Sequence, residues 1–383
     1  MKKEILREIG RLLNRFCSPD NVAFAINRKY GTNYTGEQVF FLYGQETDEE
    51  TEVPDLSETT YEVNNNISLV PTDISVLKRK KLEANHLQEL AQIVNSESKI
   101  SLPFRTNSRP LRSSKETATL VIGDVHFGKR TISLETGEEV YNRKIAIRKL
   151  EQLRNEFIRI IKLHEVDEAI ICLIGDIIDG DIIWDGQFAD IETPAFEQLE
   201  ISKVLWKIGN AVLQACPALK SLRFECVPGN HGRVAPKKTG TAKINNYDNI
   251  IYRDLFNMAE IKKEVDSSSK ISVAYSSQEP HFYDVKGHRA MIRHKGAAGG
   301  TVTSSGKVKI RGWGLIHNCD LAIWGHSHNP QTYESMGTDV IQNGSPCPMD
   351  DYAESLGVMN KPTQYIFGTS KEFPTTFVYK IYI

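Results

Sequence analysis

Five short apolar segments of this chain each end in a motif that combines glycine or a basic residue with aspartate, asparagine or histidine. In chain order the motifs are Gly123-Asp124-Val125-His126, Gly175-Asp176-Ile177-Ile178-Asp179-Gly180, Gly229-Asn230-His231-Gly232, Arg293-His294-Lys295-Gly296 and Gly325-His326-Ser327-His328. The preceding segments have the length and composition of buried strands. Because ligands bind beyond the carboxyl ends of strands in open α/β sheets, we expect the five motifs to converge on one site.

From residue 117 onward such strands alternate with helical patterns, which predicts an α/β fold. The expected helices include residues 147–157 and 199–213. The expected strands are residues 119–122, 169–174, 222–227, 290–293, 321–324, 340–342 and 376–383. A chain of 383 residues is long enough for one such domain and a smaller one.

The smaller domain is expected in residues 1–44, which have the pattern of three short helices. Residues 23–42 resemble the small helix-turn-helix modules that phage proteins place ahead of an enzyme. A generic helical cap or protein-docking module explains the same pattern. Residues 45–116 are interpreted as an acidic and polar linker with one helix that starts at the basic run Lys78 to Lys81, and residues 117–383 as the main domain.

The formal net charge of -2 excludes a globally basic nucleic-acid coat but allows a local basic patch. The six cysteines show no CxxC spacing, so we interpret them as buried free thiols of a reducing compartment, with the cytoplasm as the expected location. No apolar run approaches the roughly 20 residues of a membrane span, and the amphipathic, charged N-terminus is interpreted as mature protein.

The donor types in the five motifs are carboxylate, imidazole and amide oxygen, with no thiolate. Such donors suit manganese, iron, zinc or magnesium, and two divalent ions with manganese preferred are expected. Two ions about 3.5 to 4 Å apart can share a bridging hydroxide and clamp the phosphoryl oxygens of a substrate. The predicted chemistry is therefore metal-dependent hydrolysis without a covalent enzyme intermediate.

The motif order GDxH, GDxxDG, GNH, strand-terminal His and GHxH is the signature of the calcineurin-like metallophosphoesterases, and the chain resembles that family from about residue 117 to its end. The resemblance implies a four-layer fold, in which two mixed β-sheets pack face to face between helices, and a hydrolase acting on phosphoester bonds. It also implies the ligands: Asp124, His126 and His328 for one metal, Asn230, His294 and His326 for the other, and Asp176 for both.

His231 follows the asparagine ligand and is expected to face the leaving group as a general acid. By the same resemblance, Asp179 orients His231 and favours its protonated form; the alternative for Asp179 is a purely structural turn residue. His288 competes with His294 for the fourth motif, but it precedes the strand rather than ending it.

Basic residues near the motifs are possible substrate contacts, with a solvated loop as the alternative: Lys129, Arg130, Arg233, Lys237 and Lys238. Residues 296–306, rich in glycine, serine and threonine, are expected to form a flexible loop at the edge of the site.

The substrate must be inferred from departures within the family. The second and third motifs continue with Gly180 and Gly232, where the Ser/Thr protein phosphatases have arginine and glutamate, and the Mre11-like nucleases typically have aspartate at the latter position. The run Asp124-Val125-His126-Phe127-Gly128 looks like the first motif of nucleases. The leading hypothesis is a DNA phosphodiesterase. The alternatives are a phosphatase or diesterase for phosphoproteins or small nucleotides, and a noncatalytic scaffold like the degenerate polymerase subunits.

Overall fold

The structure is a computed structural model that describes seven segments of the chain, all within one compact unit, Pro71–Ile383. The segments are residues 85–94, 116–133, 136–235, 245–296, 317–335, 337–348 and 360–383. Three predicted features lie outside the described residues: the helix-turn-helix-like residues 1–44, the basic run Lys78 to Lys81, and most of the flexible loop expected at 296–306.

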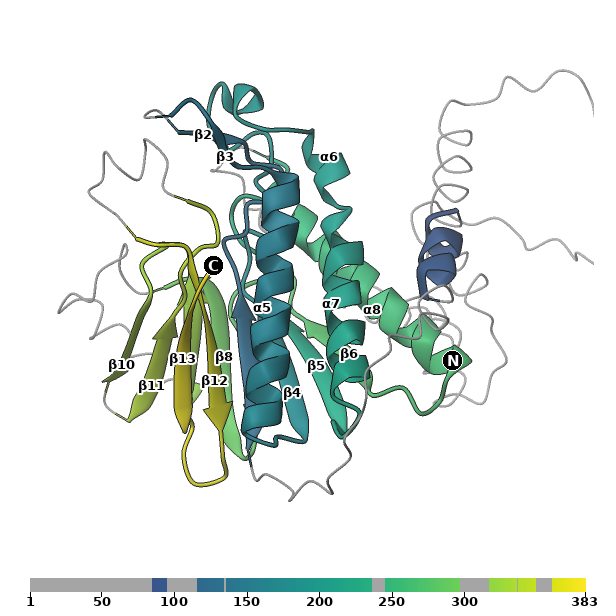
Figure 1. The fold of residues 1–383 in the computed structure, drawn as a ribbon, viewed down its shortest axis with the longest axis vertical. Coiled ribbons are helices and arrows are strands. Elements are labelled where there is room, and N and C mark those ends of the chain that lie inside the picture. Colours follow the sequence, from purple (N-terminus) through teal and green to yellow (C-terminus); the bar gives the residue numbers. More distant parts are fainter. Residues whose placement is uncertain are drawn as a thin grey trace, which may run out of the picture. The chain divides into compact units, whose positions relative to one another are not determined.

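A six-stranded mixed sheet forms the centre of the domain (Figure 1). Its order is β13 (Phe377–Tyr382), β12 (Thr363–Thr369), β1 (Thr117–Ile122), β4 (Glu168–Leu173), β5 (Ser221–Cys226) and β6 (Ile271–Tyr275). Strands β1, β4, β5 and β6 are parallel to one another, whereas β12 runs antiparallel to both of its neighbours. The carboxyl ends of β1, β4 and β5 therefore meet at one edge.

A second mixed sheet has five strands, in the order β10 (Gln331–Ser335), β11 (Thr338–Gln342), β9 (Leu321–Gly325), β8 (His288–Lys295) and β7 (His281–Val285). Its three central strands are parallel and its edge strands antiparallel. A small ribbon pairs β2 (Thr131–Ile132) with β3 (Glu139–Tyr141).

The two sheets pack face to face, and alternate residues of β4 show how. Ile170 and Cys172 join a buried cluster with residues of the second sheet, among them Tyr283, whose hydroxyl lies 3.4 Å from the Cys172 Sγ. Ile171 and Leu173 point the other way, into the cluster formed with the helices. Because both faces of β4 are covered, its sequence after Glu168 is continuously apolar rather than alternating.

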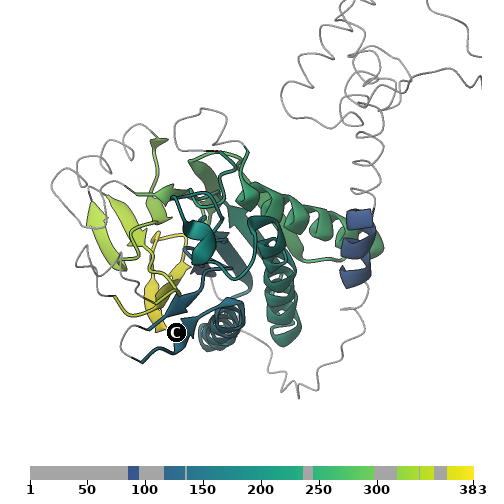
Figure 2. The ribbon, with the colours of Figure 1, turned by 90° about the horizontal axis from the view of Figure 1, so that it is seen from above.

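Three long helices cover the other face of the first sheet: α5 (Arg143–Leu163), α7 (Ile201–Ala215) and α8 (Tyr247–Val265) (Figures 1 and 2). The Asn142 side chain caps α5 by accepting the Ile145 N–H at 2.9 Å. The buried residues of α5, which include Leu150, Leu153 and Phe157, recur at helical spacing and give the helix one apolar face.

These layers confirm the α/β class and the pair of mixed sheets packed face to face. On the outer face of the second sheet, Met291, Ala322, Trp324 and Val340 form a small cluster. The helices and strands expected after residue 117 are all present, although α5 extends six residues beyond its predicted end. The elements that were not predicted include α8, β2, β3, β6, β7, β10 and β12.

The expected linker helix is described for residues 85–94 and belongs to the packed domain. Leu90 and Val94 are buried in the cluster formed by the helices and the first sheet. His86 lies 3.0 Å from the carboxylate of Asp254 on α8, and Glu89 pairs with Lys203 of α7. A segment assigned to the linker by its polar composition thus contributes to the core.

The five cysteines of the described segments are buried and form no disulfide with one another, as expected: Cys172, Cys216, Cys226, Cys319 and Cys347. None of the helices in the described segments combines the length and the apolar character that a membrane span requires.

Candidate metal centre

The loops after β1, β4, β5 and β9, together with the carboxyl end of β8, bring all seven predicted metal ligands to one place. Their donor atoms form three overlapping groups: Asp124, His126 and His328; Asp176, His294 and His326; and His126, Asp176 and His231. Asn230 joins the second group, because its Oδ1 lies 3.0 Å from the His294 Nε2. His288 lies at the opposite end of β8, near Asp320, which leaves His294 as the histidine of the fourth motif at the site.

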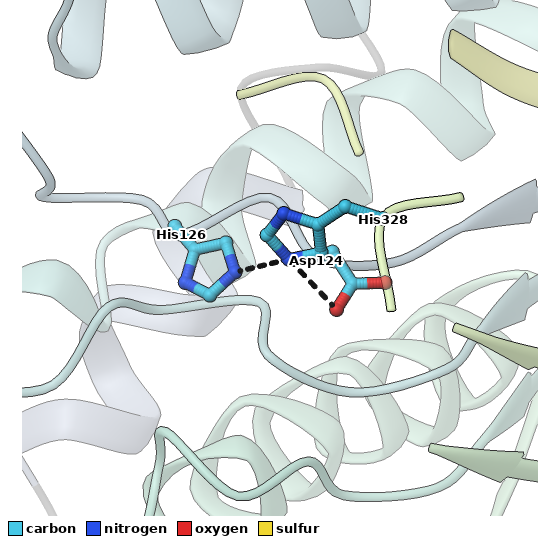
Figure 3. Close-up of side chains that lie close together, drawn as sticks. All are labelled: Asp124, His126 and His328. Atoms are coloured by element: carbon cyan, nitrogen blue, oxygen red, sulfur yellow. Dashed lines mark hydrogen bonds and ion pairs between the residues drawn. The ribbon is translucent and has the colours of Figure 1, made fainter. Parts of the chain in front are cut away.

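The first group consists of two imidazoles and one carboxylate that point toward one another (Figure 3). The Nε2 atoms of His126 and His328 are 3.1 Å apart, and the His328 Nε2 is 3.5 Å from the Asp124 Oδ1. The side chain of Asp124 is fully buried, whereas that of His328 is 34% exposed. This group is therefore reachable from the surface on the His328 side.

The second group is arranged around the Nε2 of His294. This atom lies 3.0 Å from the Asp176 Oδ2 and 3.1 Å from the His326 Nδ1, in addition to its contact with Asn230. His294 and Asp176 are both almost completely buried. Imidazole, carboxylate and amide oxygen around one point form a mixed nitrogen and oxygen site that suits a divalent transition metal.

Hydrogen bonds on the far side of two imidazoles select the nitrogen that faces the site. The Nδ1 of His294 lies 3.0 Å from the carbonyl oxygen of Ile174, which can only accept, so Nδ1 carries the proton and Nε2 is free to bind a metal. The Nδ1 of His126 lies 3.0 Å from the Asp179 Oδ1 and is held in the same way. The chemistry of this donor set fits metal binding.

The charges of the buried groups compensate one another. Burial alone would raise the pKa of Asp176, but the nearby imidazoles of His294 and His231 hold that pKa well below its usual value. Burial would lower the pKa of His294, but the Asp176 carboxylate raises it to about 10. The pKa of His326 falls to about 4 through burial and the charge of His294. Deprotonated carboxylate and neutral imidazole are the forms that bind metals, so a cation would displace the His294 proton.

The backbone of the ligand loops lies in a conformation that side chains rarely adopt. Within the described segments, eight residues other than glycine have positive φ, and five of them are predicted ligands: Asp124 (52°), His126 (48°), Asp176 (49°), His326 (69°) and His328 (54°). Such conformations are unfavourable and cluster at functional sites, where the surrounding structure enforces them. The concentration of strained backbone is an independent sign of function.

Two glycines of the motifs allow the loops to approach the carboxylates. A Cβ on Gly229 would collide with the backbone nitrogen and the Oδ1 of Asp176, and a Cβ on Gly325 would collide with the Oδ2 of Asp124. The carboxylates also tie the loops together: Asp176 Oδ1 accepts the His231 N–H at 2.7 Å, and Asp124 accepts the His326 N–H at 3.0 Å. The second bond joins a loop of the first sheet to a loop of the second.

His231 and Asp179 lie side by side next to the metal ligands. The His231 Nδ1 is 2.9 Å from the Asp179 carbonyl oxygen and 3.4 Å from its carboxylate. Burial lowers the pKa of His231, but the charges of Asp176 and Asp179 outweigh this effect and raise it. The Asp179 carboxylate makes its shorter contact with His126, so Asp179 faces a metal ligand as well as His231.

The predicted substrate contacts occupy varied settings. Arg233 donates to the carbonyl oxygens of Asn230 and Ile183, both at 3.2 Å, so its guanidinium also joins two loops of the site. Arg130 pairs with Glu139 at 2.8 Å on the surface, and the backbone of Lys129 bridges to Ile191. Lys237 and Lys238 lie outside the described segments.

Three buried polar residues that the sequence did not single out support the ligand loops. The Asp248 Oδ2 accepts the backbone N–H groups of Asp176 and Gly229 at 3.0 and 2.8 Å, and burial and the Asp176 charge raise the pKa of Asp248 to about 6. Gln198 accepts the N–H groups of Asp179 and Gly180, and Gln187 donates to the Asp179 carbonyl. An Asn-x-Asp pattern before the apolar face of α8 was the available signal for Asp248.

Comparison with known proteins agrees with this geometry. The family described as calcineurin-like phosphoesterase matches residues 117–330, which is more than half of the chain. The chain therefore belongs to the calcineurin-like phosphoesterase family. It is a hydrolase acting on phosphoester bonds, with candidate metal-binding sites formed by aspartate and histidine. No curated protein matches the sequence.

Several solved structures are similar to the chain at low identity. They include a novel archaeal phosphodiesterase (12% identity, TM-score 0.31, 70% of this chain and 99% of that chain covered). They also include a predicted phosphoesterase from Streptococcus pneumoniae (10%, 0.28, 70% and 98%). A third is vacuolar protein sorting 29 from Cryptosporidium parvum (10%, 0.31, 70% and 99%).

Replacing Asp248 tests the support of the ligand loops. Asp248→Ala leaves the buried N–H groups of Asp176 and Gly229 without their acceptor, and each such loss costs about 1–3 kcal/mol. We expect a lower urea midpoint and a lower metal content after dialysis. Asp284→Ala, at an exposed position of β7, is the matched control and should change neither. Unfolding and metal content equal to wild type in Asp248→Ala would show that these loops need no such support.

Proposed function

We propose that this phosphoesterase is a two-metal phosphodiesterase that hydrolyses DNA. The observation that carries the proposal is the third donor group, formed by His126, Asp176 and His231, which links the other two because it shares His126 with the first and Asp176 with the second. A carboxylate with two oxygens between two sets of imidazoles is suited to bridge a pair of cations. The partial exposure of His328 leaves room for a polymer to approach from solvent.

The residues divide between the two metals as the family resemblance implies. Asp124, His126 and His328 would hold one ion, Asn230, His294 and His326 would hold the other, and Asp176 would serve as a ligand to both. When bound, the ions activate water as the nucleophile and stabilise the charge on the phosphoryl oxygens. Manganese is the proposed metal, because the donors are nitrogen and oxygen and the groups contain no thiolate.

His231 acts as the general acid on the leaving oxygen. Its Nδ1 proton is held by the Asp179 carbonyl oxygen, which directs Nε2 away from Asp179. The negative charges of Asp176 and Asp179 raise its pKa and so favour the imidazolium, which has a proton to give. The backbone bond from the His231 N–H to Asp176 fixes the residue relative to the shared ligand.

The choice of DNA is supported by the sequence. The run from Asp124 to Gly128 looks like the first motif of nucleases, and residues 1–44 resemble helix-turn-helix modules of phage proteins. In this proposal the N-terminal module delivers the enzyme to the polymer, the basic residues Lys129, Arg130, Arg233, Lys237 and Lys238 contribute phosphate contacts, and the protein works in the cytoplasm.

A substrate panel tests the proposed reaction. With Mn²⁺, the purified full chain should hydrolyse DNA oligonucleotides and bis-p-nitrophenyl phosphate, and EDTA should abolish both activities because the ligands lose their cations. Phosphopeptides and p-nitrophenyl phosphate report the competing phosphatase activity, and cyclic nucleotides report a small-nucleotide diesterase. Turnover of these compounds with intact DNA would contradict the choice of DNA, and no turnover of any of them would favour the scaffold alternative.

Removing the proposed acid should slow the reaction without emptying the site. We expect His231→Ala to keep its metal content and to lower kcat on the order of a hundredfold or more, as the loss of a general acid does. His288→Ala, which replaces a histidine at the far end of β8, is the control and should retain wild-type kcat. Wild-type turnover by His231→Ala would remove His231 from the mechanism.

Removing the charge of the shared ligand should affect both ions together. Asp176→Asn keeps an oxygen at the position but removes the carboxylate that faces both donor groups, so we expect metal analysis after dialysis to show less of both ions. Asp284→Asn on the exposed face of β7 is the control and should keep the wild-type content. Two tightly held ions in Asp176→Asn would contradict the bridging role.

A further inference from the structure

The segment between β4 and α7 presents exposed apolar side chains beside the metal centre. Residues 181–197, here called the rim segment, include Ile182, Trp184, Phe188 and Phe196, which are 41%, 41%, 76% and 63% exposed. Large apolar side chains gathered in one exposed segment are typical of a surface that contacts another molecule. The rim segment follows the Gly175 to Gly180 motif directly, which places its first residues next to Asp179.

Trp184 connects this segment to the proposed acid. Its ring centroid lies 5.8 Å from that of His231, with the two rings at 69°. The His231 ring in turn lies 4.4 Å from that of His126, a metal ligand. A row of three rings thus leads from the partly exposed indole to the metal centre. Since His231 faces the leaving group in the proposed mechanism, Trp184 lies on the leaving-group side.

The backbone beside Trp184 is fixed in place. The N–H of Ile183 donates to the Gln187 Oε1 at 2.7 Å, and the Ile183 carbonyl oxygen accepts from Arg233. Gln187 is completely buried and also donates to Asp179. The exposure of Trp184 is therefore built into a braced loop, and a flat ring held in advance loses little conformational entropy when a ligand stacks on it.

The charge of the rim segment indicates what it contacts. It carries five carboxylates, Asp181, Asp185, Asp190, Glu192 and Glu197, and contains no lysine or arginine. A segment of this composition has no cation with which to hold phosphate. Its exposed rings suit a flat, uncharged group, and the flat group nearest to a scissile phosphate in DNA is a nucleobase.

Building on the proposed hydrolysis of DNA, we infer that Trp184 stacks an unpaired nucleobase of single-stranded DNA on the leaving-group side of the cleaved bond. In a duplex both faces of an internal base are covered by its neighbours, so the indole can reach a base only where the strand is single or unstacked. Trp184 is thus a specificity-determining residue, and the enzyme prefers single strands to duplexes.

The test compares two single-stranded substrates of the same length in the presence of Mn²⁺: a thymidine oligonucleotide and an oligonucleotide of abasic tetrahydrofuran residues. The measured quantity is the ratio of their kcat/KM values. Wild type should prefer the thymidine strand, and Trp184→Ala should reduce that ratio about 5- to 150-fold, the range expected for loss of one stacked base. Trp184→Phe, which keeps a flat ring, should restore most of the ratio.

Phe373→Ala is the matched control, since Phe373 is 62% exposed in the turn between β12 and β13, at the end of the sheet remote from the metal centre (Figure 1). It should keep the wild-type ratio. Equal cleavage of both strands by wild type, or an unchanged ratio in Trp184→Ala, would overturn the base contact and leave the proposed hydrolysis of DNA standing. If wild type cleaves duplex DNA but neither single strand, the base contact is overturned and the hydrolysis of DNA stands. If wild type cleaves neither the single strands nor duplex DNA, the proposed function itself is overturned.

Discussion

The ion pair between Asp176 and His294 is the interaction on which the rest of the site depends. Both side chains are almost completely buried, and their atoms lie 3.0 Å apart. Burying an unpaired charge would be very unfavourable, so each group requires the other when no cation is present. A divalent cation offers the carboxylate a stronger partner and leaves the imidazole neutral. The same compensation that stabilises the buried site therefore prepares it to exchange a proton for a metal.

This compensation holds only while the loops keep a strained geometry. Five predicted ligands have positive φ, and the energy of those conformations must be offset by the surrounding structure. The carboxylates of Asp124 and Asp176 supply part of the offsetting energy, because they accept hydrogen bonds from N–H groups of neighbouring ligand loops. Asp248, at the start of α8, supplies another part by accepting the N–H groups of Asp176 and Gly229. Strands from two sheets and the end of a helix thus determine the position of each donor.

The sequence predicted which donor side chains converge better than it predicted the individual strands around them, for a physical reason. Each ligand motif taken alone could be an ordinary turn, but five apolar segments in succession end in such a motif, whereas several strands carry weaker signals. β12 is entirely buried although it contains Thr363 and Gln364, because Gln364 bonds to the Gly123 N–H and to Asn343. A polar residue whose hydrogen bonds are made inside the protein cannot be told from a loop residue by its sequence alone. The edge strands β7 and β10 are short and half polar, and only pairing with a neighbour identifies them.

The sequence analysis did not single out the supporting residues, for a related reason. Gln198 and Asp248 bond to backbone groups, which every residue possesses, so no partner type reveals them. Arg233 shows the consequence for function: its sequence position suggests only a phosphate contact, but the structure shows that its guanidinium also joins the carbonyl oxygens of Asn230 and Ile183. This link fixes Asn230, a predicted metal ligand, relative to the backbone next to Trp184. A molecule that contacts the rim segment is thereby positioned relative to the metal ligands, because Arg233 ties the loop of Asn230 to the loop of Ile183 and Trp184.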